Sequence, residues 1–136
     1  MIFIDTGAFL ARYLARDQFH EKAREGFAEI ARAGVRTFCS NFVLDETITL
    51  LGRRAGYAFA AERARLLYSS QALVILRTER QDELRALDAF DKFSDQHVSF
   101  TDCISFVLMR KNKLRKAFSF DSHYTRAGFE IFPISP

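Results

Sequence analysis

The stretch Ile2-Phe3-Ile4-Asp5-Thr6 decides the fold, because it puts an apolar strand at the start of the chain and a carboxylate directly after it. Residues 6–13 then follow a helical pattern, and short apolar runs alternate with longer helical patterns along the rest of the chain. Strands that alternate with helices are typical of an α/β fold with a mainly parallel sheet. We therefore expect right-handed crossovers that place helices on both faces of the sheet.

The same alternation predicts where the individual elements lie. We expect strands over residues 2–5, 35–39, 72–76, 117–120 and 129–132. We expect helices over residues 6–13, 19–33, 41–54, 56–68, 78–93, 100–110 and 122–127. In the helix over 78–93 we expect Leu84, Leu87 and Phe90 to face inward. The apolar run 72–76 indicates a strand that is covered on both faces of the sheet.

Length and composition limit the class of protein. A chain of 136 residues favours one domain, which we expect to span residues 1–136. Hydrophobic residues make up 49% and charged residues 27%, a balance that excludes wholesale disorder. No apolar run approaches the roughly 20 residues that span a bilayer, so we expect no membrane association. The N-terminus does not resemble a signal peptide, and the two cysteines cannot form a disulfide framework, so we expect a reducing cytoplasm.

Four acidic residues are predicted to lie at one edge of the sheet. Asp5 follows the first strand and Asp121 follows the fourth, whereas Asp102 opens the helix that runs down to the fourth strand. Glu46 lies in the first half of the helix after the second strand, at the border of its apolar stripe. Ligands of such sheets bind beyond the carboxyl ends of the strands. This edge is therefore the candidate site.

Each of these acids also has a purely structural interpretation. Asp5 and Asp121 could each cap the helix that follows. Ser99-Phe100-Thr101-Asp102 fits a capping box before an apolar run, and Glu46 could pair with Arg53 on the helix surface. Asp45, which adjoins Glu46, could take its place, although the apolar stripe favours Glu46. The convergence of all four acids favours a functional site over four independent caps.

Clustered carboxylates need compensation. Two charges about 4 Å apart repel each other by roughly 4 kcal/mol at an effective dielectric constant near 20. Either some carboxyl groups stay protonated, or a divalent cation neutralises them. Carboxylate oxygens suit Mg²⁺ or Mn²⁺, and such an ion could activate a water molecule and hold a phosphate oxygen. The cluster therefore predicts phosphodiester hydrolysis.

The four acids lie in stretches with a recognisable order. These are Ile2-Phe3-Ile4-Asp5-Thr6, Leu44-Asp45-Glu46-Thr47, Phe100-Thr101-Asp102-Cys103-Ile104 and Phe118-Ser119-Phe120-Asp121. Together they resemble the PIN domain and, within it, the VapC-type toxins of type II toxin–antitoxin systems. The resemblance covers the whole chain.

The resemblance implies a three-layer α/β/α fold and an endoribonuclease that depends on Mg²⁺ or Mn²⁺. It implies that Asp5, Glu46, Asp102 and Asp121 are catalytic and bind the metal, and that Thr6 and Ser119 help to orient the metal or its water. It also implies an antitoxin partner that blocks the site, and usually a homodimer. The helices between residues 41 and 69 carry apolar side chains that could form its interface: Phe42, Tyr57, Phe59, Leu66, Leu67 and Tyr68.

Other residues could contact RNA around the acidic edge. The candidates are aromatic or basic side chains that can stack on single-stranded bases: Arg12, Arg53, His123, Tyr124 and Arg126. The basic run over residues 110–116 ends the helix that starts near Asp102, so we expect it at the opposite edge as a solvated helix cap. We expect Cys39 and Cys103 to be small core residues.

Several other function classes can be weighed against this prediction. A receiver domain would need paired acids after the first strand, and a dehalogenase-type phosphatase would need an Asp where Gly7 stands. No phosphate-binding loop of the P-loop type is present. Two alternatives stay open: a PIN-like module that only binds RNA or a partner, and a PIN nuclease of RNA processing.

Overall fold

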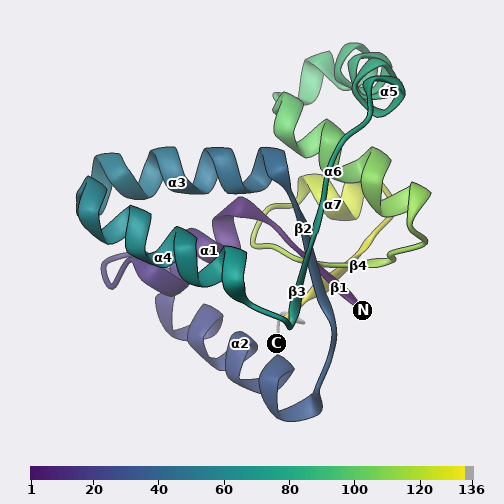
Figure 1. The fold of residues 1–136 in the computed structure, drawn as a ribbon. Helices are drawn as coiled ribbons and strands as arrows, with labels where there is room; N and C mark the ends of the chain where they lie inside the picture. The colour runs from purple at the N-terminus through teal and green to yellow at the C-terminus, as the bar shows by residue number, and fades with distance from the viewer. Residues whose placement is uncertain (134–136) are drawn as a thin grey trace.

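A central sheet of five parallel strands forms the middle layer of the computed structural model, in the order β3-β2-β1-β4-β5 (Figure 1). The strands are β1 Ile2–Ile4, β2 Thr37–Ser40, β3 Leu73–Leu76, β4 Lys116–Phe118 and β5 Glu130–Phe132. The structure describes residues 1–133, so residues 134–136 of the predicted domain lie outside it. Each strand lies within two residues of its predicted position.

The helices form the two outer layers. They are α1 Thr6–Tyr13, α2 His20–Ala33, α3 Asn41–Ala55, α4 Tyr57–Ser69, α5 Arg80–Lys92, α6 Phe100–Lys111 and α7 His123–Arg126, with a short 3₁₀ turn at Ser94–Gln96. Figure 1 shows α1 to α4 on one side of the sheet and α5 to α7 on the other, as right-handed crossovers in this strand order require. The predicted three-layer α/β/α fold is confirmed.

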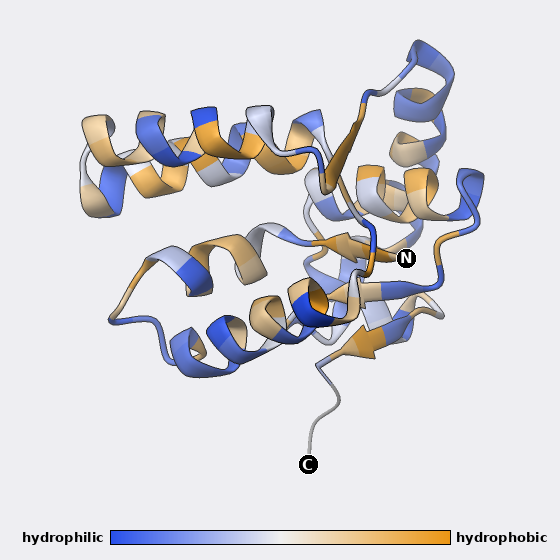
Figure 2. Cartoon of the chain, turned by 60° about the horizontal axis from the view of Figure 1, so that its bottom comes forward, coloured by the Kyte–Doolittle hydropathy of each residue, from blue (hydrophilic) through white to orange (hydrophobic). Residues whose placement is uncertain are grey.

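The central strand explains why the opening stretch is apolar. β1 pairs with both β2 and β4, and Phe3 and Ile4 are buried in the core. Figure 2 shows the strands mainly in hydrophobic colours, whereas the helices alternate between hydrophobic and hydrophilic residues. β3 differs from the prediction of a strand covered on both faces, since all of its residues are only half-buried. It is an edge strand that pairs with β2 alone.

The predicted inward face of α5 is wrong. Leu84, Leu87 and Phe90 are 42%, 51% and 45% exposed, whereas Asp82 and Ala86 are buried. The helix packs against α6 with Ala86 buried, with an ion pair between Asp82 and Lys111, whose Nζ lies 3.1 Å from both carboxylate oxygens, and with the half-exposed Phe90 ring in edge-to-face contact with Phe100. Because small residues let two helices approach closely, α5 buries the face that carries Ala86 and not the more apolar face that carries Leu84 and Leu87.

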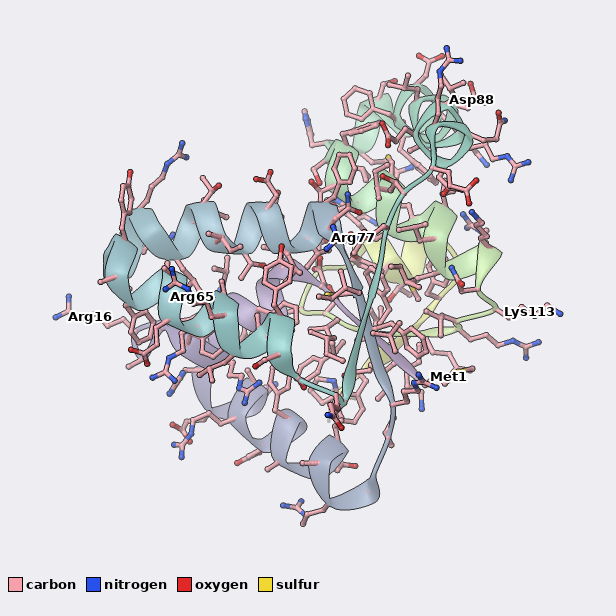
Figure 3. The ribbon with its side chains drawn as sticks, in the orientation of Figure 1. Met1, Arg16, Arg65, Arg77, Asp88 and Lys113 are labelled. Carbon is pink, nitrogen blue, oxygen red and sulfur yellow. The ribbon has the colours of Figure 1, made fainter. Side chains whose placement is uncertain are left out.

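The basic run lies at the end of α6 opposite to Asp102, as predicted. Lys111 pairs with Asp82 and lies 3.7 Å from Glu79, while the Arg110 guanidinium donates to the carbonyl of Ala127. Lys113 projects outward at this edge of the molecule (Figure 3). The two cysteines, Cys39 and Cys103, are buried and free, which confirms their predicted place in the core.

Two further predictions concern surfaces. Of the side chains expected to form a dimer interface, Tyr57, Leu66 and Tyr68 are exposed, but Leu67 is buried in the core. The homodimer therefore stays a prediction, with Leu67 removed from its surface. Within residues 1–133, no helix combines the length and the apolar character needed to cross a membrane.

Gly26 on α2 allows the Phe-rich core to close, and its substitution tests this packing. A Cβ atom there would lie 2.6 Å from Cζ of the fully buried Phe118 and 3.2 Å from Cε1 of Phe132. We predict that Gly26→Ala lowers the free energy of unfolding by about 1–3 kcal/mol, as overpacked cores do. Urea denaturation at neutral pH measures this effect.

The matched control is Gly52→Ala on α3. Its Cβ would lie 2.8 Å from Cδ1 of Tyr57, a side chain that is 80% exposed and can swing into solvent. Helix propensity then favours alanine by up to about 1 kcal/mol, so this variant should be as stable as the wild type or more so. Equal losses in both variants would contradict the packing argument.

Candidate active site

Asp5 is both a helix cap and a buried carboxylate at the edge of the sheet. Its Oδ1 atom accepts hydrogen bonds from the backbone N–H of Thr6 at 2.8 Å and from the Tyr124 hydroxyl at 3.0 Å. Its Oδ2 atom accepts from the Ser119 hydroxyl at 3.0 Å. The residue is only 6% exposed. The capping interpretation and the site interpretation therefore both hold for this residue.

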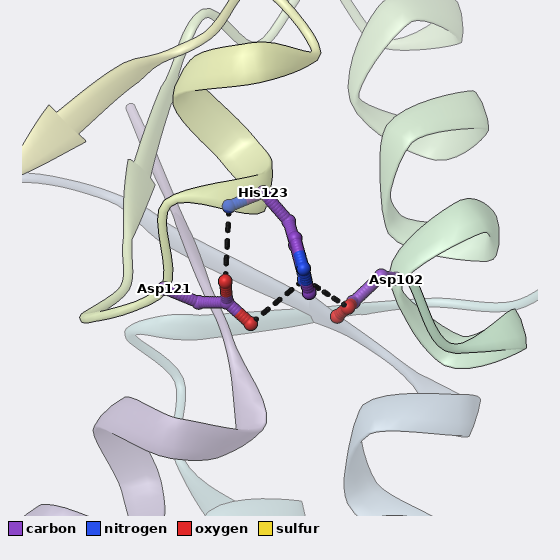
Figure 4. Close-up of side chains that lie close together, drawn as sticks. All are labelled: Asp102, Asp121 and His123. Atoms are coloured by element: carbon purple, nitrogen blue, oxygen red, sulfur yellow. Dashed lines mark hydrogen bonds and ion pairs between the residues drawn. The ribbon is translucent and has the colours of Figure 1, made fainter. Parts of the chain in front are cut away.

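Asp102, Asp121 and His123 lie together (Figure 4). They line the same hollow as Asp5. His123 Nδ1 lies 3.0 Å from Asp121 Oδ2 and 3.4 Å from Asp102 Oδ2. The backbone fixes all three residues: the N–H of Asp102 donates to Ser99 Oγ, and the N–H of His123 donates to Asp121 Oδ1. The loop after β4 and the first turn of α6 thus bring the three side chains to one point.

Burial and mutual repulsion shape the protonation of these acids. Burial raises the pKa of Asp5 to about 7, and the nearby Asp102 carboxylate adds to the rise, although the three hydrogen bonds oppose it. Burial also raises the pKa of Asp102, helped by the Asp121 charge and opposed by His123. A cation placed among these carboxylates would relieve both penalties.

The acids surround a hollow of about 720 Å³ beyond the carboxyl ends of β1 and β4. Glu46 reaches this hollow from α3 and is half-buried, whereas its neighbour Asp45 is exposed. The structure therefore brings together the four acids that the sequence singled out, Asp5, Glu46, Asp102 and Asp121. Glu46 lies farther from the centre, because the tight cluster consists of Asp102, Asp121 and His123.

The donor set fits a divalent cation. Asp102, Asp121 and His123 each offer one ligand atom, and these atoms lie within 4.8 Å of one another. The hydroxyl of Thr6, which lines the same hollow, is buried and has no hydrogen-bond partner within residues 1–133. Ser119 links the two acids beside the sheet, since it donates to Asp5 and accepts from the N–H of Asp121.

Of the predicted RNA contacts, Tyr124 and Arg12 take other positions, whereas His123 lies at the acidic edge as expected. Tyr124 is fully buried, so its ring cannot stack on RNA, and it holds Asp5 instead. Arg12 lies over the Phe27 ring at 4.5 Å and borders a different hollow, since α1 carries it away from the edge. His123 belongs to the acidic cluster itself. Arg53 and Arg126 are exposed and do not line the acidic hollow.

Two residues of the hollow were not among the predicted site residues, and the sequence had placed one of them, His97, outside the acidic cluster. Asp17 and His97 both line the hollow, from the turn before α2 and from the loop before α6. Neither follows a strand or belongs to a motif, so no local signal marks them.

Cys103, next to Asp102, is no nucleophile, because burial raises the pKa of its thiol to about 11.

Comparisons with known proteins agree with this geometry. A family model described as PIN domain matches residues 2–130. The chain is 34% identical to the 23S rRNA-specific endonuclease VapC20 of Mycobacterium tuberculosis, over 98% of this chain and 99% of that protein. It is 32% identical to a VapC ribonuclease of Archaeoglobus fulgidus, over 90% of this chain and 78% of that protein.

A solved structure is also similar. The crystal structure of Mycobacterium tuberculosis VapC20, described as a sarcin-ricin loop cleaving toxin, superposes with a TM-score of 0.88 at 31% identity. The match covers 95% of this chain and 96% of that chain.

The raised pKa of Asp5 predicts how metal-free stability depends on pH. The folded state binds a proton at Asp5 between about pH 4 and pH 7, whereas the unfolded state does not, so stability falls as pH rises through this window. We predict that in Asp5→Asn the free energy of unfolding no longer falls over this pH range on account of residue 5. The effect can reach several kcal/mol, because each pKa unit corresponds to about 1.4 kcal/mol. Urea denaturation in EDTA at several pH values measures the free energy of unfolding, and the same dependence on pH in both proteins would contradict the prediction.

Proposed function

This chain belongs to the PIN domain family, and we propose that it is a metal-dependent endoribonuclease that hydrolyses RNA phosphodiester bonds, with Mg²⁺ or Mn²⁺ as cofactor. One observation carries the proposal. Carboxylates from three distant segments, at Asp5, Asp102 and Asp121, converge on one hollow at the switch point of the sheet. Relatives with VapC ribonuclease and endonuclease names match nearly the whole chain, which supports the same chemistry here.

We infer separate roles for the residues around the hollow. Asp102, Asp121 and His123 would hold the ion, and Asp5 and Glu46 would complete its surroundings from β1 and α3. A bound divalent ion supplies charge neutralisation at the phosphate and lowers the pKa of a water molecule. Ser119 and Tyr124 keep the Asp5 carboxylate in place through their hydroxyl groups, and the free hydroxyl of Thr6 would orient water.

The substrate and partners follow from the relatives and from the charge of the site. The identity to a 23S rRNA-specific endonuclease makes 23S ribosomal RNA the proposed target class. We infer that the protein is the toxin of a toxin–antitoxin pair, and that its antitoxin places an Arg side chain among the carboxylates. A homodimer through α3 and α4 would present Tyr57, Leu66 and Tyr68 to the second copy.

The Asp102→Asn variant tests catalysis. We predict that the wild type cleaves purified 23S rRNA in Mg²⁺ or Mn²⁺ but not in EDTA, and that Asp102→Asn loses cleavage at least 100-fold, as expected when a metal ligand is removed. Primer extension locates the cut. Wild-type RNA binding without cleavage in either metal would instead favour a PIN-like binding module that has no catalytic activity.

Glu46→Gln, with Asp45→Asn as its matched control, tests which acid of α3 serves the site. Glu46 faces the hollow and Asp45 is exposed. We predict that Glu46→Gln reduces both cleavage and the rise in thermal midpoint with Mn²⁺, and that Asp45→Asn changes neither. Differential scanning fluorimetry with a metal titration gives the second readout. The opposite pattern would move the ligand to Asp45.

A further inference from the structure

A second hollow lies directly beside the acidic one. It has a volume of about 810 Å³ and lies between α2 and the segment from Ser119 to Thr125. The two hollows share four lining residues: Phe19, Phe120, Asp121 and Ser122. We call this second space the outer hollow. Because both hollows include Asp121, a ligand that fills both would lie against a residue of the candidate metal site.

A stacked pair of aromatic rings lines both hollows. The rings of Phe19 and Phe120 lie 4.5 Å apart between centroids, at an angle of only 6°, and both are half-buried. Both positions are fixed by the backbone: the N–H of Phe19 donates to Asp17 Oδ1, and Phe120 stands between Ser119 and Asp121, which are hydrogen-bonded to each other. The pair is thus a preformed aromatic wall.

The charges of the outer hollow do not suit phosphate. Its lining includes one cation, Lys22, and three carboxylates, those of Glu25, Glu29 and Asp121. Glu25 and Glu29 lie one helical turn apart on α2, so they line the hollow together. The net negative charge repels the RNA backbone. The same carboxylates are good acceptors for the exocyclic amino groups of bases.

We propose that the outer hollow is a nucleobase pocket, in which a base next to the cleaved phosphate packs against the Phe19–Phe120 pair and donates its amino group to Glu25 or Glu29. The inference rests on the proposed ribonuclease function. Unstacked bases of single-stranded RNA are commonly held by aromatic side chains. The volume lies within the range of roughly 300–1,000 Å³ that is usual for small-molecule pockets.

The pocket also predicts a preference among bases. Cytosine has an amino group where uracil has a carbonyl oxygen, and a carboxylate accepts from the first but repels the second. The protein should therefore bind cytosine-containing RNA more tightly than uracil-containing RNA of the same length. This comparison is close to ideal, because the two pyrimidines have the same size and stack similarly.

The first experiment removes the aromatic wall. Fluorescein-labelled hexamers of cytidine are titrated by anisotropy into full-length Asp102→Asn protein, which is not expected to cut them. Adding Phe19→Leu or Phe120→Leu should weaken binding about tenfold, since stacking on an aromatic side chain contributes on that scale. Phe59→Leu is the matched control, because Phe59 is a half-buried ring on α4 that lines neither hollow. Equal affinities in all four proteins would overturn the proposal.

The second experiment tests the base edge. The affinity ratio between cytidine and uridine hexamers should exceed one in the parent protein and should fall toward one in Glu25→Gln/Glu29→Gln, because an amide can donate as well as accept. Glu21→Gln, at an exposed acid of α2 that pairs with Arg24, should leave the ratio unchanged. A parent ratio of one or less would overturn the pocket assignment.

The two failures can be told apart. If the wild type cleaves RNA in metal but the Phe19→Leu and Phe120→Leu variants bind and cleave like the wild type, the pocket is wrong and the nuclease stands. If the pocket variants weaken RNA binding but the wild type cleaves no RNA, the pocket stands and catalysis is wrong. For this comparison, Phe19→Leu and Phe120→Leu are also made without Asp102→Asn, and the rise of their thermal midpoints with Mn²⁺ shows that they keep the metal site.

Discussion

The buried carboxylate of Asp5 is the interaction on which the rest of the site depends. It ends the central strand, caps α1 and accepts hydrogen bonds from Ser119 and Tyr124, which lie more than 110 positions later in the chain. These contacts join β1 to the loop after β4 and to α7. A carboxylate that is 6% exposed requires such donors, because an unpaired buried charge is costly. These side-chain contacts add to the backbone hydrogen bonds from Asp5 N–H to Phe118 and from Ser119 N–H to Phe132, which also hold this edge.

The acids around Asp5 repel one another, and either protonation or a bound cation can relieve this repulsion. Burial and repulsion raise the pKa values of Asp5 and Asp102, which disfavours the charged carboxylates that would bind a metal. His123 offsets part of this cost, since its Nδ1 atom lies between Asp102 and Asp121. Unfavourable electrostatics of this kind are typical of functional sites, where charged groups are placed for chemistry at a cost in stability.

The sequence predicted most of the fold and the four acids that line the hollow. It did not predict which face of α5 is buried or which side chain donates to Asp5. Strand and helix periods located every strand and α-helix but not the 3₁₀ turn at Ser94–Gln96, and the apolar stripe favoured Glu46 over the exposed Asp45. The period of α5 allowed more than one inward face, and close packing of Ala86 against α6 left Leu87 exposed. Tyr124 could be seen as an aromatic near the edge, but not as a buried donor to Asp5.

The sequence by itself determined the alternation of strands and helices, and the carboxylates that follow the strands, because these depend on local pattern and on the direction of parallel strands. Only the tertiary structure decided which side chains meet. The approach of Ser119 and Tyr124 to Asp5, the place of His123 between two acids and the stacking of Phe19 on Phe120 join segments far apart in the chain. Such contacts depend on how whole layers pack against each other, and a local residue pattern does not determine which distant side chains will touch.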